Sequence, residues 1–203
     1  MEAYTLNNMR LRIHRLLGAF GTQEGNGIMQ EYLGDGMIMN TRCIGMPSPQ
    51  QVEEQTDALA VWIWSLKDYI KERYAILGGN QADVETYIND CRYLPLCADI
   101  ANGAKHGTLT QSRSGKFARI GRISIPIRGG LIIQQTRHDP DVDVKVMASG
   151  YDRPKVLVNS NQGKYLGSGE VILRNGMKEW DAFFRRYPQL VEPSPRASGS
   201  RST

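Results

Sequence analysis

Ser48-Pro49-Gln50-Gln51 starts the longest helix that the sequence predicts, and the other predicted elements lie before and after it. The Ser48 hydroxyl can cap free amides of the first turn, Pro49 suits the first helical position, and Gln51 completes a capping box. Apolar side chains then recur at helical spacing on one broad face: Val52, Leu59, Trp62, Ile63, Leu66, Tyr69 and Ile70. Such a wide apolar face is typical of a helix in the core of a bundle.

Three further helices are predicted in the first half of the chain. Apolar residues recur at helical spacing over 6–20, 80–91 and 96–106. The glycine-rich stretch 21–36 predicts a loop, and the apolar stretch 37–44 is too short to assign to helix or strand.

After Ser112 the apolar period changes to two, which indicates strands. The isoleucines over 120–127 alternate with polar residues, with a bulge at Gly121, and a turn at 128–130 predicts a hairpin with the apolar residues 131–133. Valines predict two more strands, over 142–146 and at 156–158. The helical spacing of Met177, Trp180, Phe183 and Phe184 predicts a closing helix.

These elements predict an α+β fold, in which an N-terminal bundle of about four helices precedes a small antiparallel β-sheet and a C-terminal helix. The expected units are the bundle over 1–110 and a β-rich segment with its closing helix over 111–192, packed on the bundle. The tail 193–203 is rich in Ser, Pro and Arg without an apolar pattern, so disorder is expected there.

Composition favours a globular protein in the cytoplasm. The chain is 40% apolar and 23% charged, has no apolar run long enough to span a bilayer, and does not begin with a signal-peptide pattern. Its three cysteines lack the spacing of a zinc site, and residues 138–143 lack the glycine and final glutamate of an EF-hand loop. No phosphate loop or dinucleotide fingerprint is present, so neither a metal nor a cofactor is expected.

The charge of the chain is uneven along its length. Residues 1–104 carry a net charge of −5 and residues 105–203 a net charge of +9, with seven Lys or Arg and no acid between Lys105 and His138. This pattern favours an anionic partner such as RNA. The candidate nucleic-acid-binding residues are Arg92, Lys105, Arg113, Lys116, Arg119, Arg122 and Arg128. Alternatively, these residues form a solvated sheet face that packs against the acidic first half.

Polar residues form a stripe on the fourth predicted helix. Asn102 and His106 are one turn apart, and Asp99 lies on the same stripe. His106 is a candidate general acid or base because its ordinary pKa is near neutrality, with Asn102 and Asp99 as its neighbours. Alternatively, the three side chains tie the helix to a loop or to the sheet. Gly103 predicts the close approach of a neighbouring helix.

Two segments carry a family resemblance. Trp62-Ile63-Trp64-Ser65-Leu66-Lys67-Asp68-Tyr69-Ile70 resembles the long helix of a group of uncharacterised bacterial and phage proteins. Cys97-Ala98-Asp99-Ile100-Ala101-Asn102-Gly103-Ala104-Lys105-His106 resembles the D-x-x-N-x-x-K-H helix of the same group. The resemblance covers roughly residues 50–110, and the group is similar in turn to the HEPN helical superfamily.

The HEPN resemblance implies a metal-free, dimeric ribonuclease site. Asn102 and His106 match the Asn and His of the HEPN motif Arg-Asn-x-x-x-His, whereas Ala101 stands at the Arg position. In that scheme the Arg positions the scissile phosphate and the His assists proton transfer. Lys105 points about 100° away from His106 on a helix, and Arg92 on the preceding segment is the other candidate for the missing charge.

Three functional hypotheses follow. The first is a HEPN-like binding or regulatory module without catalysis, acting as a homodimer with RNA as a possible partner. The second is a metal-independent endoribonuclease that uses His106 and Asn102. The third is a protein-interaction partner in a phage-defence or toxin–antitoxin setting, with an exposed aromatic edge around Trp64 as its interface.

Overall fold

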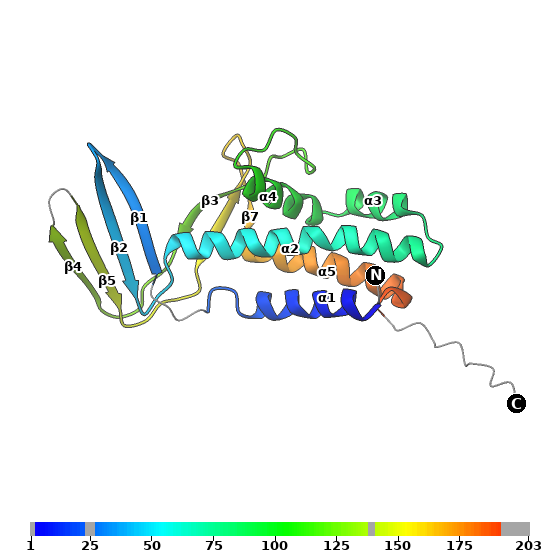
Figure 1. The fold of residues 1–203 in the computed structure, drawn as a ribbon, viewed down its shortest axis with the longest axis horizontal. Helices are drawn as coiled ribbons and strands as arrows, with labels where there is room; N and C mark the ends of the chain where they lie inside the picture. Colours follow the sequence, from blue (N-terminus) through cyan, green and yellow to red (C-terminus); the bar gives the residue numbers. More distant parts are fainter. Residues whose placement is uncertain (1–2, 23–26, 138–140, 192–203) are drawn as a thin grey trace, which may run out of the picture.

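The computed structural model describes residues 3–22, 27–137 and 141–191 (Figure 1). The elements are α1 (Ala3–Gly18), β1 (Gly27–Gly34), β2 (Met37–Ile44), α2 (Pro49–Ile76), α3 (Gln81–Asp90), α4 (Leu94–His106), β3 (Arg119–Ser124), β4 (Leu131–Arg137), β5 (Val142–Ala148), β6 (Lys155–Asn159), β7 (Tyr165–Ser168), α5 (Gly169–Arg186) and the 3-10 turn η1 (Pro188–Leu190).

Helix α2 is the centre of a helical body in which it contacts α1, α3, α4 and α5 (Figure 1). The predicted capping box is confirmed: the Gln51 amide donates to the Ser48 hydroxyl at 3.2 Å, and the Ser48 amide donates to Gln51 Oε1 at 3.0 Å. The predicted apolar face is buried at its main positions, including Ile63 and Ile70. Burial of this face along a 28-residue helix stabilises the whole body.

Helix α5 packs into the same core as α1 to α4. Trp180 and Phe183 are fully or almost fully buried, and the Trp180 indole donates to the Ile63 carbonyl at 2.9 Å. At Gly176 a side chain would approach Cys97 Sγ to 2.7 Å, so the glycine lets α5 lie close against α4.

Glu179 of α5 caps the N-terminus of α4. Its carboxylate accepts hydrogen bonds from the amides of Arg92, Tyr93 and Leu94, at 2.8 to 3.1 Å. Tyr93, the residue at the N-cap position, makes no side-chain capping bond. A negative charge at this end of a helix is favourable because the free amides carry partial positive charge.

The strands form two separate sheets. The three-stranded sheet β3-β6-β7 packs on the helical body, and Val156 and Val158 of β6 belong to the common core. The four-stranded sheet β1-β2-β5-β4 stands at one end of the molecule, beyond the helices (Figure 1). Its hairpins β1-β2 and β4-β5 are antiparallel and are joined by a parallel pairing of β2 with β5. We call it the protruding sheet.

The predicted order of a HEPN-like N-terminal bundle followed by one small antiparallel sheet is wrong, although the fold is α+β. The hairpin β1-β2 lies between α1 and α2, where residues 21–36 predicted a loop. The overlooked signal is Asp35-Gly36, whose positive φ angles of 50° and 77° are those of a tight hairpin turn. Because β2 pairs in parallel with β5, one sheet contains strands from both halves of the chain. The predicted division into a helical first half and a sheet-forming second half is therefore also wrong.

The predicted hairpin between 120–127 and 131–133 is also wrong. Strand β3 pairs with β6, and β4 pairs with β5 in the other sheet, so the chain crosses between sheets at 125–130. Local features of the second half are confirmed, namely the irregularity between Ile120 and Ile123 and the burial of one face of the C-terminal helix. The predicted disorder of 193–203 and the first half of the metal-like stretch 138–143 fall outside the described residues.

Candidate functional site

Asp99 is a fully buried carboxylate that holds the loop after α4. It accepts hydrogen bonds from the Ser112 hydroxyl at 2.7 Å, the Arg113 amide at 2.7 Å and the Ala118 amide at 3.1 Å, and both the amide and the hydroxyl of Ser114 also donate to it. Five donors satisfy the charge, which a buried carboxylate requires. The geometry of Asp99 is that of a tie between helix and loop.

Asn102 and His106 lie apart from this network, on the last turns of α4. Both line an open depression of about 420 Å³ with Thr108, Leu109, Thr110 and Gln111. Neither side chain makes a hydrogen bond within the described part of the chain, and the His106 ring is exposed. The structure therefore brings Asn102 and His106 together, as their spacing predicted, but turns Asp99 away from them.

A second cavity of about 400 Å³ lies on the other side of the segment that follows α4. Its walls come from α2, the end of α4, the loop 107–118, the start of β3 and Asn161 in the β6-β7 turn. Glu53 and Asp57 of α2 line it, as do Arg119 and Phe117. We call it the α2–α4 cavity.

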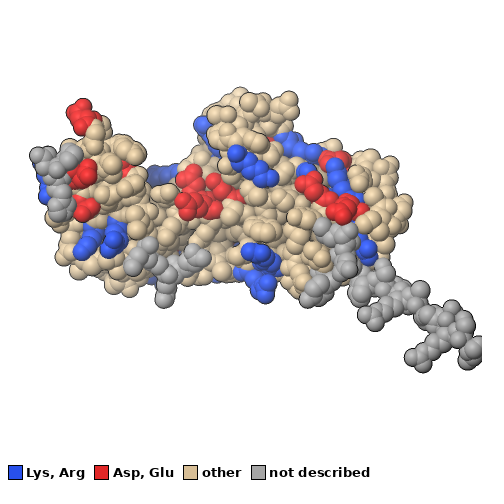
Figure 2. All heavy atoms as spheres, in the orientation of Figure 1, with Lys and Arg blue, Asp and Glu red and all other residues tan. Residues whose placement is uncertain are grey.

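The ionised form of Asp57 is disfavoured in this cavity. Burial, and secondly the negative charge of Glu53 one turn away, raise the pKa of Asp57 from 3.8 to about 6. Figure 2 shows acidic side chains gathered over the N-terminal half of α2. The sequence analysis missed this pair, whose signal is two acids at i and i+4 beside the buried positions Val52 and Thr56.

Gly103 does not mark a close approach of helices, so that prediction is wrong. A side chain at Gly103 would meet nothing within 4 Å, and the residue instead lines the α2–α4 cavity. Phe117 on another wall adopts a positive φ of 51°, which is strained for a bulky residue. Its amide donates to the Ser112 hydroxyl at 2.9 Å, which connects this strain to the loop that Asp99 holds.

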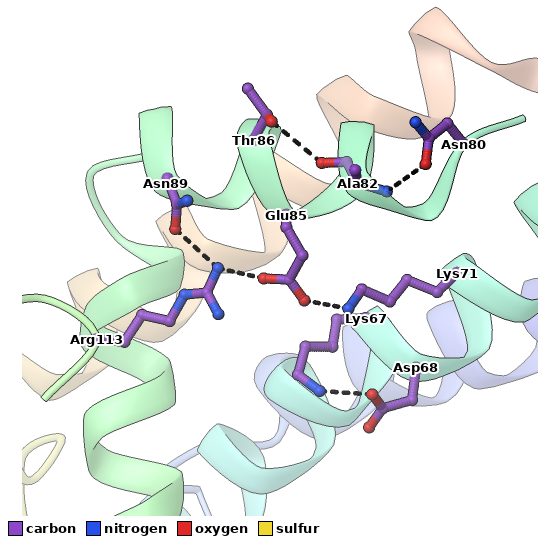
Figure 3. Close-up of polar contacts among 9 residues, drawn as sticks. All are labelled: Lys67, Asp68, Lys71, Asn80, Ala82, Glu85, Thr86, Asn89 and Arg113. Atoms are coloured by element: carbon purple, nitrogen blue, oxygen red, sulfur yellow. Dashed lines mark hydrogen bonds and ion pairs between the residues drawn. The ribbon is translucent and has the colours of Figure 1, made fainter. Parts of the chain in front are cut away.

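Arg113, one of the predicted nucleic-acid-binding residues, is engaged inside the protein (Figure 3). Its guanidinium bonds Glu85 and donates to Asn89 Oδ1 at 2.7 Å, and Lys71 bonds the same Glu85 carboxylate. The two cations hold the pKa of Glu85 below its ordinary value, although burial opposes them. This cluster joins α2, α3 and the loop after α4, so Arg113 is occupied by structural contacts.

The remaining predicted basic residues fall into two groups. Arg92 lies at the opposite end of α4 from His106, about 20 Å away along a 13-residue helix, and Arg128 pairs with Asp152. The other four carry no ion pair within the described residues and lie at the end of α4, in the following loop and on β3: Lys105, Lys116, Arg119 and Arg122. Of these four, Lys105 adjoins His106 in the chain, and Arg119 lines the α2–α4 cavity instead of the depression that holds His106.

Trp64 does not form an exposed aromatic edge. Only 7% of the residue is accessible, and Lys67 and Arg113 lie over its ring at 5.0 and 5.4 Å from the centroid. Trp62 is the more accessible indole, and Arg12 covers it at 4.7 Å. The predicted interface around Trp64 therefore lacks its main exposed residue.

The protruding sheet carries the most exposed apolar side chains of the described chain. All seven residues of β4 are exposed, with Ile132 at 57% and Ile133 at 62%, and Tyr32 of β1 reaches 78%. No described helix is packed across either face of this sheet (Figure 1). At one corner, a side chain at Gly27 would meet Ser48, which shows that the start of α2 closes only that corner.

One face of the protruding sheet is mostly apolar. Side chains alternate between the faces of a strand, so the register assigns each residue to one face. We define the valine face by Val142, Val144 and Val146 of β5 and the residues in register with them. Its other apolar members are Met29, Met39, Cys43, Leu131, Ile133 and Ala148. The opposite face carries a polar chain in which Gln30 donates to Asn40 at 2.8 Å and Asn40 donates to Asp143 at 3.2 Å. It also carries exposed apolar side chains, namely Ile28, Tyr32 and Ile132.

Comparison with protein-family models, curated proteins and solved structures finds no match. The resemblance of residues 50–110 to the D-x-x-N-x-x-K-H group stays a prediction. None of the helices within the described residues has the length and apolar character needed to cross a membrane. The same part of the chain holds no cluster of three His, Cys, Asp or Glu side chains suited to a metal ion.

Proposed function

We propose that this protein is a protein-association module whose protruding sheet binds a protein partner. The observation that carries the proposal is the valine face, an apolar sheet face over which no described helix is packed. Sheets of globular proteins bury their apolar face against another layer. A partner layer would cover the members of this face that stay accessible, such as Ile133 at 62%, whereas Thr41, Cys43 and Val142 are already buried within the chain.

The edge strand β4 supports the same proposal. Exposed, flat, apolar edge strands pair or pack with other chains unless a bulge, a charge or a proline blunts them. The other edge, β1, has an irregularity between Tyr32 and Gly34 and carries Glu31. The Leu131-Ile132-Ile133 segment of β4 has neither protection.

A photo-crosslinking amino acid at position 133 tests the proposal in cells that produce the full chain. We expect a covalent adduct with a protein at Ile133 and none at Tyr165, which is similarly exposed at 58% but belongs to β7 of the three-stranded sheet. The adduct should disappear when Val144→Asp places a charge on the valine face. Absence of any adduct at position 133, or an adduct that survives Val144→Asp, contradicts the proposal.

RNA binding near the end of α4 is the second candidate function. It is favoured by four basic residues between the end of α4 and β3 that carry no ion pair within the described residues: Lys105, Lys116, Arg119 and Arg122. Glu53 and Asp57 repel phosphate from the α2–α4 cavity, so the contact would lie on the Asn102 and His106 side.

Titration with labelled single-stranded RNA at increasing salt tests this second candidate. Saturable binding that weakens steeply with salt and falls in Lys116→Ala, but not in Arg128→Ala, supports it. Cleavage in EDTA by the wild type but not by His106→Ala would extend it to a ribonuclease. No binding at low salt contradicts both versions.

A further inference from the structure

One row of the valine face ends in opposite charges. The register places Glu31 of β1 beside Met39, Met39 beside Val142, and Val142 beside Arg137 of β4. Glu31 and Arg137 are therefore the outer ends of one row, three strand spacings or about 14 Å apart, which is too far for a direct ion pair. Both side chains are exposed, and neither has an ion pair within the described residues.

A two-fold axis parallel to the strands makes this row complementary to itself. When two such sheets stack face to face about that axis, the outer strands exchange, so β1 of one copy lies over β4 of the other. Glu31 then faces Arg137 of the second copy, and the symmetry repeats the pair at the other edge. Between these pairs, Met39 of each copy lies over Val142 of the other, and the half-buried Met39 makes most of this contact because Val142 is only 7% accessible.

The same operation disfavours the opposite face. The register places Arg42 of β2 beside Lys145 of β5, both on the opposite face. Stacking that face about the same axis sets Arg42 over Lys145 of the second copy, twice, in the middle of the contact. Like charges brought together at the centre of an interface weaken association strongly. The charge pattern therefore selects the valine face.

The size of the valine face fits a small dimer interface. Four strands about 4.8 Å apart, each with about seven residues at 3.3 Å, give an outline of roughly 400 Å². This outline is about half of the roughly 800 Å² per partner of a stable interface, so the dimer is expected to be weak. Aligned sheets also pack about 10 Å apart, which leaves room for interlocking valine and methionine side chains.

We infer that the partner of the protruding sheet is a second copy of this chain, stacked valine face to valine face, with Glu31 and Arg137 paired across both edges. This inference rests on the proposed function and names its partner. The apolar centre supplies the affinity, and the two ion pairs at the rim fix the orientation.

Charge reversal at the two ends of the row tests the inference by sedimentation of the full chain. Glu31→Arg and Arg137→Glu each set like charges against each other twice in the dimer, so each should raise the dissociation constant at least about tenfold. The double variant Glu31→Arg with Arg137→Glu exchanges the two charges and should return the constant to within about threefold of the wild type. The control Arg42→Glu reverses a charge on the opposite face and should leave the constant unchanged.

Two outcomes would overturn the inference. The first is a wild-type chain that keeps the mass of one copy up to about 100 µM, a range that covers weak dimers. The second is a double variant that dimerises no better than the single variants. An adduct at position 133 with a different protein would retain the proposed function and reject the dimer, whereas no adduct rejects both.

Discussion

Two aspartates show at the residue scale how this chain uses its buried charge. Asp99 is fully buried and has five hydrogen-bond donors, so its carboxylate is satisfied. Asp57 is partly buried beside Glu53, and its pKa is raised to about 6. Groups with a strongly shifted pKa concentrate at functional sites, so Asp57 makes the α2–α4 cavity a candidate site.

Asp57→Asn should stabilise the protein at neutral pH. The pKa of Asp57 in the folded protein exceeds the unfolded value of 3.8, so ionising Asp57 destabilises the folded state. This destabilisation is absent below about pH 4, grows as the pH rises to 6, and is complete above pH 6. The full shift corresponds to about 3 kcal/mol, which solvent screening of this partly exposed group reduces to about 1 kcal/mol. Urea unfolding at pH 7 and pH 4 measures the gain in stability of Asp57→Asn, with Glu54→Gln as the control. A less stable variant at pH 7 would contradict the assigned environment.

Asp99→Asn should have the opposite effect. Arg113 and Ala118 donate to different oxygens of Asp99, so the side-chain amide of asparagine keeps an acceptor for one of them and presents a donor to the other. The loop therefore loses bonds and gains one clash of donors. We expect a loss of about 2–3 kcal/mol in the free energy of unfolding. Asp90→Asn, at an exposed position of α3, should change it by less than about 0.5 kcal/mol. Equal effects of the two substitutions would show that the Asp99 network does not stabilise the protein.

The helices were predictable at the scale of elements because their signals are local. The capping box at Ser48, the cap at Asn80 and the stop at Gly107 need only neighbouring residues, and all three are present. The partners of the strands were not predictable in this way, because β2 pairs with a strand about 100 residues later. Asp35-Gly36 is a local signal for the β1-β2 hairpin, because both residues adopt the positive φ angles of a tight turn.

Two glycines on packed helices should respond in opposite ways to substitution by alanine. At Gly176 a new Cβ would lie 2.7 Å from Cys97 Sγ, so Gly176→Ala should cost about 1–3 kcal/mol through overpacking. At Gly103 a new Cβ meets nothing within 4 Å, so Gly103→Ala should gain about 0.5–1 kcal/mol from helix propensity. Thermal and urea unfolding of both variants measure these changes. A stabilised Gly176→Ala variant would contradict the described contact between α4 and α5.

At the scale of the whole molecule, the arrangement of the candidate site could be predicted only in part. The i,i+4 spacing correctly placed Asn102 and His106 together at the end of α4, whereas Arg119 lines the α2–α4 cavity instead of their depression. The acids of α2 that face Arg119 were not predictable, because they come from a segment about 60 residues earlier. The valine face was likewise hidden, since its residues come from both halves of the chain.

The two charged halves of the chain are mixed in the folded molecule. Lys and Arg lie beside Asp and Glu on both the helical body and the lobe of the protruding sheet (Figure 2). Among the described residues, Arg113 of the basic run pairs with Glu85 of the acidic first half, whereas Arg128 pairs with Asp152 of the second half. The alternative in which the basic run packs against the acidic first half therefore holds for Arg113 and stays a prediction for the other residues.

Sedimentation of the wild-type chain beside Ile133→Asp and Ile132→Asp tests the central claim most directly. These neighbours on β4 are almost equally exposed, and they point to opposite faces of the protruding sheet. We predict twice the chain mass for the wild type and for Ile132→Asp, and the mass of one chain for Ile133→Asp, with unchanged circular dichroism. Identical masses for all three proteins would contradict the account that the valine face is the surface through which this protein associates.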